Sequence, residues 1–123
     1  MYRRDSNDKA WRSVKARVRE RDKVDRIFKI LSLKEAMILR KSAGPQLNIL
    51  DSAHYIAVSE NPSLIYDENN IILLNRFSHT NLDSFKDPVD GHSITREEVR
   101  MWWERLLKGN IHQYEYLKER GLI

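Results

Sequence analysis

The chain of 123 residues contains no cysteine. Disulfides and cysteine-ligated zinc are therefore excluded, and any metal ion must be held by His, Asp, Glu or Asn side chains. No apolar run approaches the roughly 18 residues that a membrane helix needs, and residues 1–5 lack the apolar core of a signal peptide. Repeats and low-complexity tracts are also absent from the sequence. These absences predict one cytoplasmic domain over residues 1–123, with no membrane partner.

The charge is unevenly distributed along the chain. Residues 1–41 carry 14 Lys and Arg against 6 Asp and Glu, whereas residues 42–123 carry 8 against 12. The two parts therefore contribute +8 and −4 to the net charge of +4. A basic N-terminal third is typical of a phosphate-binding arm, because backbone contacts dominate nucleic-acid affinity. A solvated helix face explains the same counts equally well.

Apolar spacing and capping motifs predict two helices in this basic third. The first covers residues 8–22, with Trp11 as an anchor in the core. Residues 24–30 fit either a strand or a helix. Ser32 and Glu35 then form a capping box that opens a second helix, which the Ala-Gly-Pro sequence at 43–45 ends.

The middle of the chain reads as two strands followed by a helix. We expect strands at about 47–55 and 71–74, separated by a loop of turn-forming residues. A helix over 76–85 follows the second strand. Residues 86–93 contain Asp, Pro and Gly and are predicted to be a linker.

Two further helices are predicted at the C-terminal end. Thr95 and Glu98 form a second capping box, and the stripe of Trp102 and Leu106 behind it is typical of core packing. Asn110 is placed to cap the last helix.

Four polar residues in the middle of the chain carry the chemistry. His54 ends the first predicted strand, and Asn70 opens the second. His79 and Asp83 lie four residues apart, which places them on one face of a helix. A neutral histidine is the natural base near neutral pH, and a cation held by imidazole and carboxylate can bind a phosphate oxygen. Each residue also has a simpler reading: a structural histidine, a turn asparagine or a surface helix pair.

The order and spacing of these residues resemble the HNH endonuclease family of the ββα-metal fold, in its phage-encoded form. The residues that carry the resemblance span about Ala10 to Leu107, and they are Trp11-Arg12, Val18 to Asp22, Ala53 to Ile56, Asn61, Tyr66 to Asn70, Ile72 to Leu74, His79, Asp83, Ile94-Thr95, Glu97-Glu98 and Trp102-Trp103.

The resemblance implies an α+β fold with a ββα-metal core over 46–86, a basic helical lead-in over 1–45 and C-terminal helices over 93–121. It implies His54 as the general base, Asn70 as the residue that fixes the loop, and His79 and Asp83 as ligands of a divalent metal. The DNA phosphates would be contacted by four basic residues, which are Arg12, Lys15, Arg19 and Arg76.

Two departures from the family pattern stand out. Ala53 occupies the position where many members carry a metal-binding aspartate, and Asp51 shares its strand face and is a candidate substitute. The four zinc-ribbon cysteines of many phage members align near Asp25, Phe28, Asn75 and Ser78. We expect apolar packing by residues 24–39 to replace the zinc.

The function implied is a metal-dependent DNA endonuclease or nickase of phage or prophage origin, with weak sequence preference. Magnesium is the expected ion, with manganese, nickel or zinc as alternatives, and a packaging protein such as terminase is an expected partner of this class. A catalytically silent DNA-binding or assembly module is the alternative that Ala53 favours. A helical interaction protein is the third, and exposure of Trp103 would favour it.

Overall fold

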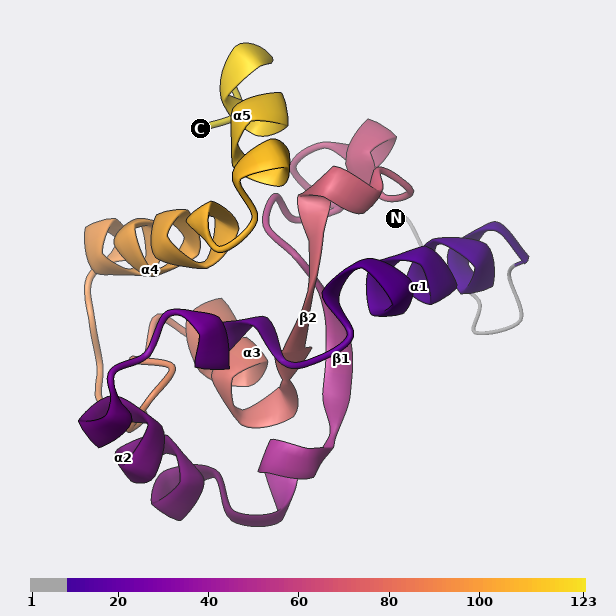
Figure 1. The fold of residues 1–123 in the computed structure, drawn as a ribbon. Coiled ribbons are helices and arrows are strands. Elements are labelled where there is room, and N and C mark those ends of the chain that lie inside the picture. The colour runs from indigo at the N-terminus through magenta and orange to yellow at the C-terminus, as the bar shows by residue number, and fades with distance from the viewer. Residues whose placement is uncertain (1–8) are drawn as a thin grey trace.

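The computed structural model describes residues 9–123 (Figure 1). The predicted helix start at Asp8 and the basic residues before Lys9 lie outside these residues. Two helices, two strands and three further helices follow one another along the described chain, in agreement with the α+β prediction. In order they are α1 Lys9–Asp22, α2 Leu33–Ala43, β1 Leu50–His54, β2 Ile71–Asn75, α3 Arg76–Asp83, α4 Arg96–Lys108 and α5 Ile111–Glu119. None of the described helices is long and apolar enough to cross a membrane.

The two strands form an antiparallel pair in which Leu50 lies opposite Asn75 and His54 lies opposite Ile71. Every residue of β2 is buried, because helices cover both faces of the pair (Figure 1). One face packs on α1 through a small cluster of Trp11, Val14, Val18, Ile71 and Leu73. The other face joins the main core, which α2, α3, α4 and α5 also enter. Burial on both faces explains why β2 reads as an unbroken apolar run.

The predicted caps are confirmed. Both capping boxes form, at Ser32 with Glu35 and at Thr95 with Glu98, and Asn110 caps α5. Trp103 is only 5% exposed and belongs to the main core, so the observation that would have favoured an interaction protein is not made.

Two predicted boundaries were wrong, and one open assignment is decided. The first strand begins at Leu50 rather than at residue 47, because a 3₁₀ turn, Gly44–Asn48, intervenes with Pro45 in its first turn. The stretch 24–30, for which strand and helix were both open, holds a short 3₁₀ helix, Arg26–Lys29. The helix predicted to reach residue 85 ends at Asp83.

Side chains, rather than a third strand, occupy the outer edge of β2. Asp22 accepts a hydrogen bond from the Leu73 backbone N–H at 2.9 Å, and Asp25 accepts one from the Asn75 N–H at 3.2 Å. The carbonyl of Ile71 accepts from Arg21 and Gln113. Buried backbone groups need such partners, so these side chains make the two-stranded sheet possible.

The positions aligned with the absent cysteines are joined by hydrogen bonds. Asn75 donates through Nδ2 to Asp25 at 2.8 Å and to the Ser78 hydroxyl at 3.0 Å. Phe28 packs against the main core beside Ile27. Residues 24–39 contribute apolar packing, and a buried polar network that was not predicted joins the chain segments as well.

We expect Asp22→Asn to destabilise the fold strongly. Asp22 pairs with the fully buried Arg26 at 3.1 Å, and removing one partner of a buried pair costs about 3–5 kcal/mol. Burial alone would raise the pKa of Asp22, but hydrogen bonds from Arg21 and the Leu73 N–H, with the charges of Arg21 and Arg26, hold it below its ordinary value. The stabilisation by ionised Asp22 is thus complete above the pKa that Asp22 has in the unfolded chain. It is lost as the pH falls through the lower pKa that Asp22 has in the folded protein.

Urea unfolding at several pH values measures this effect. The free energy of unfolding of Asp22→Asn should be lower than that of the wild type by the full amount at pH 7. This difference should become smaller below about pH 4. Arg17→Ala is the control, because its ion pair with Glu68 is long, at 3.8 Å, and exposed; we expect a change under about 0.5 kcal/mol. Equal losses for the two variants would show that the buried pair has no special role.

Candidate functional site

Three of the predicted site residues line one pocket. His54 reaches it from the end of β1, and His79 and Asp83 reach it from α3. The pocket has a volume of about 380 Å³, and Ser52 and the loop after His54 complete its wall. Side chains from the strand and from the helix therefore meet as the order of the residues predicted.

A stacking contact and a hydrogen bond hold the ring of His54. The ring stacks on Trp11 of α1, with centroids 5.3 Å apart and planes 16° apart, and its Nε2 lies 3.0 Å from the Ile65 carbonyl. A carbonyl oxygen only accepts hydrogen bonds, so Nε2 of the neutral ring carries the proton. The lone pair is then on Nδ1, which is the atom able to take up a proton.

His79 lies between two carboxylates. Its Nδ1 is 3.1 Å from Oδ2 of Asp51, and its Nε2 is 3.3 Å from Oδ2 of Asp83. Asp51 also binds the guanidinium of Arg76, at 3.0 Å. Burial would raise the pKa of Asp51, but hydrogen bonds from Arg76 and His79 and their charges lower it. Asp51 is thus an ionised acceptor that holds the His79 ring.

The donor set on the pocket side suits a divalent cation. Two ligands of one ion, each at about 2.1 Å, lie roughly 3 Å apart, close to the separation of 3.3 Å between His79 Nε2 and Asp83. Metal-binding histidines usually give their other ring nitrogen to a carboxylate, which fixes the ring, and Asp51 is placed to do this. Asp51 lies at the opposite ring nitrogen, so it fits the role of orienting residue better than that of ligand.

Asn70 is fully buried at the start of β2. Its Oδ1 accepts from the Ile56 N–H at 2.8 Å, and its Nδ2 donates to the carbonyls of Ile56 and Leu64. Asn70 therefore holds the two ends of the loop that follows His54. This loop also carries the Ile65 carbonyl, which contacts His54 Nε2. Asn70 therefore helps to position His54 indirectly, by holding the loop.

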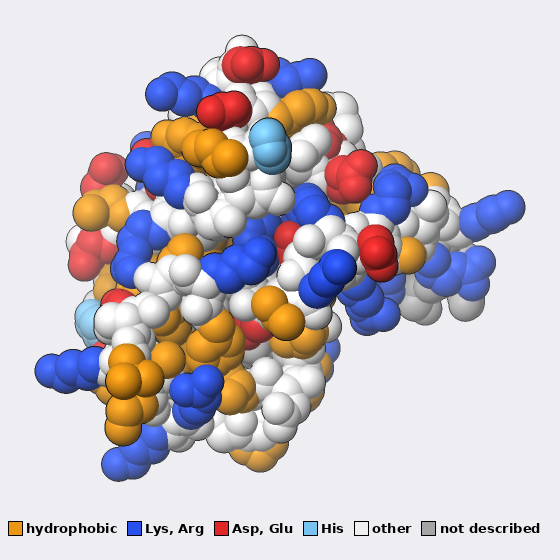
Figure 2. All heavy atoms as spheres, in the orientation of Figure 1, with side chains coloured by type: hydrophobic (Ala, Val, Ile, Leu, Met, Phe, Trp, Pro, Cys, Tyr) orange, Lys and Arg blue, Asp and Glu red, His pale blue; other side chains and the backbone are white. Residues whose placement is uncertain are grey.

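The four predicted phosphate contacts divide into two groups. Lys15, Arg19 and Arg76 line a second pocket of about 420 Å³ on the other side of His79, together with Asp51 and Trp11. Arg12 is exposed on α1 outside both pocket walls. Figure 2 shows Lys and Arg side chains gathered over the part of the surface that α1 occupies in Figure 1.

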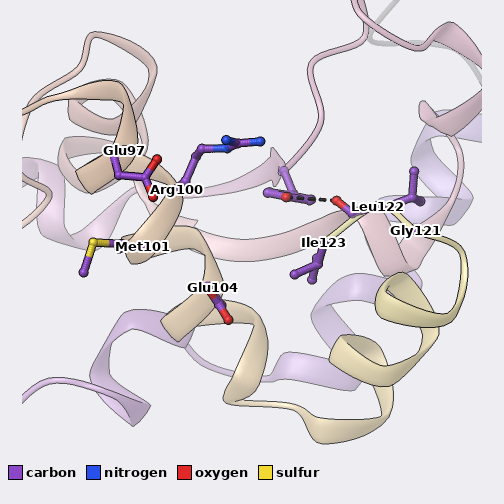
Figure 3. Close-up of a pocket in the computed structure, with 8 residues that line it drawn as sticks. Glu97, Arg100, Met101, Glu104, Gly121, Leu122 and Ile123 are labelled. Atoms are coloured by element: carbon purple, nitrogen blue, oxygen red, sulfur yellow. Dashed lines mark hydrogen bonds between the residues drawn. The ribbon is translucent and has the colours of Figure 1, made fainter.

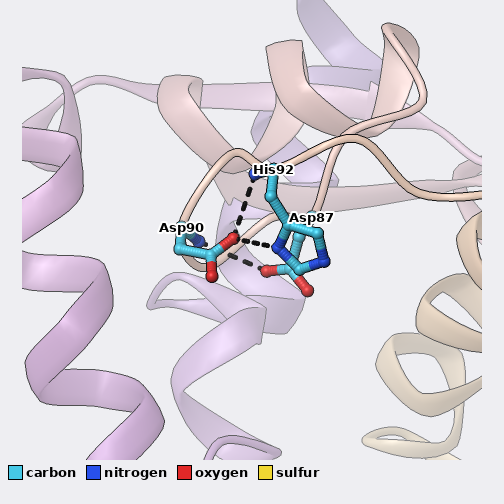
Figure 4. Close-up of side chains that lie close together, drawn as sticks. All are labelled: Asp87, Asp90 and His92. Atoms are coloured by element: carbon cyan, nitrogen blue, oxygen red, sulfur yellow. Dashed lines mark hydrogen bonds and ion pairs between the residues drawn. The ribbon is translucent and has the colours of Figure 1, made fainter.

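Asp87, Asp90 and His92 form a cluster in the loop before α4 that the sequence analysis did not select (Figure 4). Asp87 accepts hydrogen bonds from the backbone of Val89 and Asp90. Asp90 accepts from the backbone of His92 and contacts its Nδ1, and this contact raises the pKa of His92. Both carboxylates of the cluster thus accept hydrogen bonds from within the turn itself. This arrangement agrees with the prediction that residues 86–93 form a linker.

Two contributions to the site were not foreseen. Trp11 was predicted as a core anchor and is only 7% exposed, but it also stacks on His54. The Asp51 contact with His79 was hinted at only by strand alternation. Neither contact is local in sequence, and no short motif marks them.

Comparison of the chain with family models, curated proteins and solved structures finds no match. The case for a function therefore rests on the residues and their geometry.

We expect Asn70→Ala to loosen the loop after His54. The change leaves partly buried backbone groups of Ile56 and Leu64 without their partners, at about 0.5–1.5 kcal/mol for each lost hydrogen bond. Hydrogen exchange should show lost protection over residues 55–65, while α4 and α5 keep theirs. Asn61→Ala, which removes an exposed turn contact with Ser63, is the control. Unchanged exchange in Asn70→Ala would contradict the loop-fixing role.

Proposed function

We propose that the protein is a metal-dependent endonuclease that hydrolyses phosphodiester bonds in DNA, with a ββα-metal core formed by β1, β2 and α3. The supporting observation is that His54, as an oriented base, shares a pocket with His79 and Asp83, as a cation-binding pair. The charge of +8 on residues 1–41 suits a polyanionic substrate.

In this proposal His54 activates the attacking water. Its Nε2 proton is held by the Ile65 carbonyl, so Nδ1 accepts the proton of a water that attacks phosphorus. Trp11 keeps the ring plane fixed while the histidine becomes charged. The general base belongs to β1 and not to the pair on α3, so it remains able to take the proton.

The pair on α3 serves the other side of the reaction. His79 Nε2 and Asp83 would hold the cation, and Asp51 keeps His79 in the required orientation. When bound, the ion supplies positive charge to a phosphoryl oxygen and to the leaving oxygen. One carboxylate, one imidazole and water suit Mg²⁺ or Mn²⁺. Lys15, Arg19 and Arg76 would bind flanking phosphates, which gives little base readout and hence weak sequence preference.

Ala53 favours the alternative of a silent DNA-binding module, because it is fully buried and offers no donor. The two functions differ in what His54 does. A nuclease needs its base, whereas a binding module keeps its whole activity without it.

We expect His54→Ala to abolish metal-dependent cleavage and to keep DNA binding. Loss of a general base lowers rates by about 10² to 10⁴-fold. The measurement is conversion of supercoiled plasmid with EDTA, Mg²⁺ or Mn²⁺, alongside binding in EDTA. His112→Ala removes an exposed histidine on α5 and should cleave as the wild type does. Intact plasmid and intact single-stranded DNA with the wild type under every metal, with salt-sensitive binding retained, would establish the silent module instead.

We expect Asp83→Asn to lower the affinity for Mn²⁺ more than Asp51→Asn does. Asp83→Asn removes a ligand and should prevent detectable Mn²⁺ binding. Asp51→Asn leaves the ligands in place but weakens the hold on His79, so affinity should fall by about 10 to 100-fold. Calorimetric titration with Mn²⁺ separates the two. Equal losses would make Asp51 a ligand, and an unchanged Asp51→Asn would remove it from the site.

A further inference from the structure

A groove continues from the candidate site toward α4. It has a volume of about 530 Å³ and shares Tyr55, Ala57, Asp83 and Trp103 with the pocket of His54. One wall is the loop after β1, and the other is α4. The groove and the pocket therefore form one continuous surface past Asp83.

Two arginines one helical turn apart line the wall formed by α4. Arg96 and Arg100 are both exposed, and among residues 9–123 no carboxylate lies within ion-pair distance of either. Figure 3 shows Arg100 reaching from α4 toward Leu122, with its guanidinium end pointing away from Glu97. The carboxylates of Glu60 and Asp83 also line the groove, but neither forms an ion pair with these arginines, so both cations are available to an anionic ligand.

Phe85 stands at the mouth of the groove in an unusual conformation. Its φ is 57°, in the left-handed region where glycine is favoured after a helix. Hydrogen bonds such as Lys86 N–H to the Asn81 carbonyl, at 2.8 Å, hold the turn. The ring is 46% exposed, 5.7 Å from the Arg96 guanidinium. Glycine would suit this backbone better, and nearly half of Phe85 is exposed beside the groove, where its ring is accessible to a ligand.

We propose, resting on the nuclease function above, that this groove binds one unpaired nucleotide beside the scissile phosphate. Arg96 and Arg100 hold its backbone phosphates, and its base stacks on Phe85. The floor of Leu82, Val99 and Trp103 is apolar, as a base face requires, and stacking of this kind tolerates every sequence. A base within a duplex cannot enter the groove, so the substrate class is single-stranded or branched DNA.

The test is fluorescence anisotropy in EDTA, with labelled oligodeoxynucleotides that are single-stranded or duplex. Arg96→Ala/Arg100→Ala should weaken single-strand binding about tenfold and duplex binding much less. Loss of two phosphate contacts should lower the slope of log affinity against log salt by about 1.4 on the single strand. The matched control is Lys108→Ala/Lys118→Ala, which removes two charges near Tyr114, outside the groove.

Phe85→Gly separates binding from folding. The variant removes the ring and relieves the left-handed backbone, so its Tm should equal or exceed that of the wild type. Its single-strand affinity should nevertheless fall about tenfold. Unchanged affinity in Phe85→Gly would overturn the proposal, as would equal losses in the two charge variants, or duplex affinity that falls as much as single-strand affinity.

Failure of the groove and failure of the nuclease are distinguishable. Binding in EDTA does not require cleavage, so groove effects in a protein that cleaves nothing would support the groove and refute the nuclease. If the wild type cleaves plasmid but the Arg96→Ala/Arg100→Ala variant binds single strands as the wild type does, the groove proposal is refuted and the nuclease proposal stands.

Discussion

The hydrogen bonds along the outer edge of β2 are the constraint on which the rest of the structure depends. A strand buried on both faces has backbone groups that water cannot reach, and a two-stranded sheet leaves half of them unpaired. Asp22 and Asp25 accept from Leu73 and Asn75, and Arg21 and Gln113 donate to Ile71. The edge is therefore satisfied by side chains that come from both ends of the chain.

This edge also sets the start of α3 and hence the candidate site. Asn75 donates to Asp25 and, as the N-cap, accepts from the Ser78 backbone N–H at 2.8 Å. One residue thus joins the buried network to the first turn of the helix. His79 follows directly after this turn, so the buried network determines its position relative to β1. A buried cluster of Asp25, Asn75 and Ser78 therefore positions the helix.

Local patterns in the sequence predicted most helices and strands, whereas most side-chain contacts between distant residues were not predicted. The capping boxes at Ser32 and Thr95 and the apolar run of β2 depend on neighbours in sequence, and they were correct. The pocket shared by His54 and His79 followed from the order of strand and helix. The stacking of Trp11 on His54 joins residues 43 positions apart, and no periodicity reports such a pair. The strand was predicted to begin too early because Leu47 and Ile49 alternate with Asn48 as in a strand, although the 3₁₀ turn extends to Asn48.

The two nitrogens of His79 decide what Asp51 can do. They lie on opposite sides of one ring, so a carboxylate at Nδ1 and a cation at Nε2 do not compete for the same atom. Asp51 cannot take the place of a ligand at residue 53 without releasing His79 and Arg76. The proposed nuclease would therefore hold its cation through two protein ligands, His79 and Asp83, with the His79 ring held in place by Asp51. Most of the coordination sphere would be open to phosphate and water.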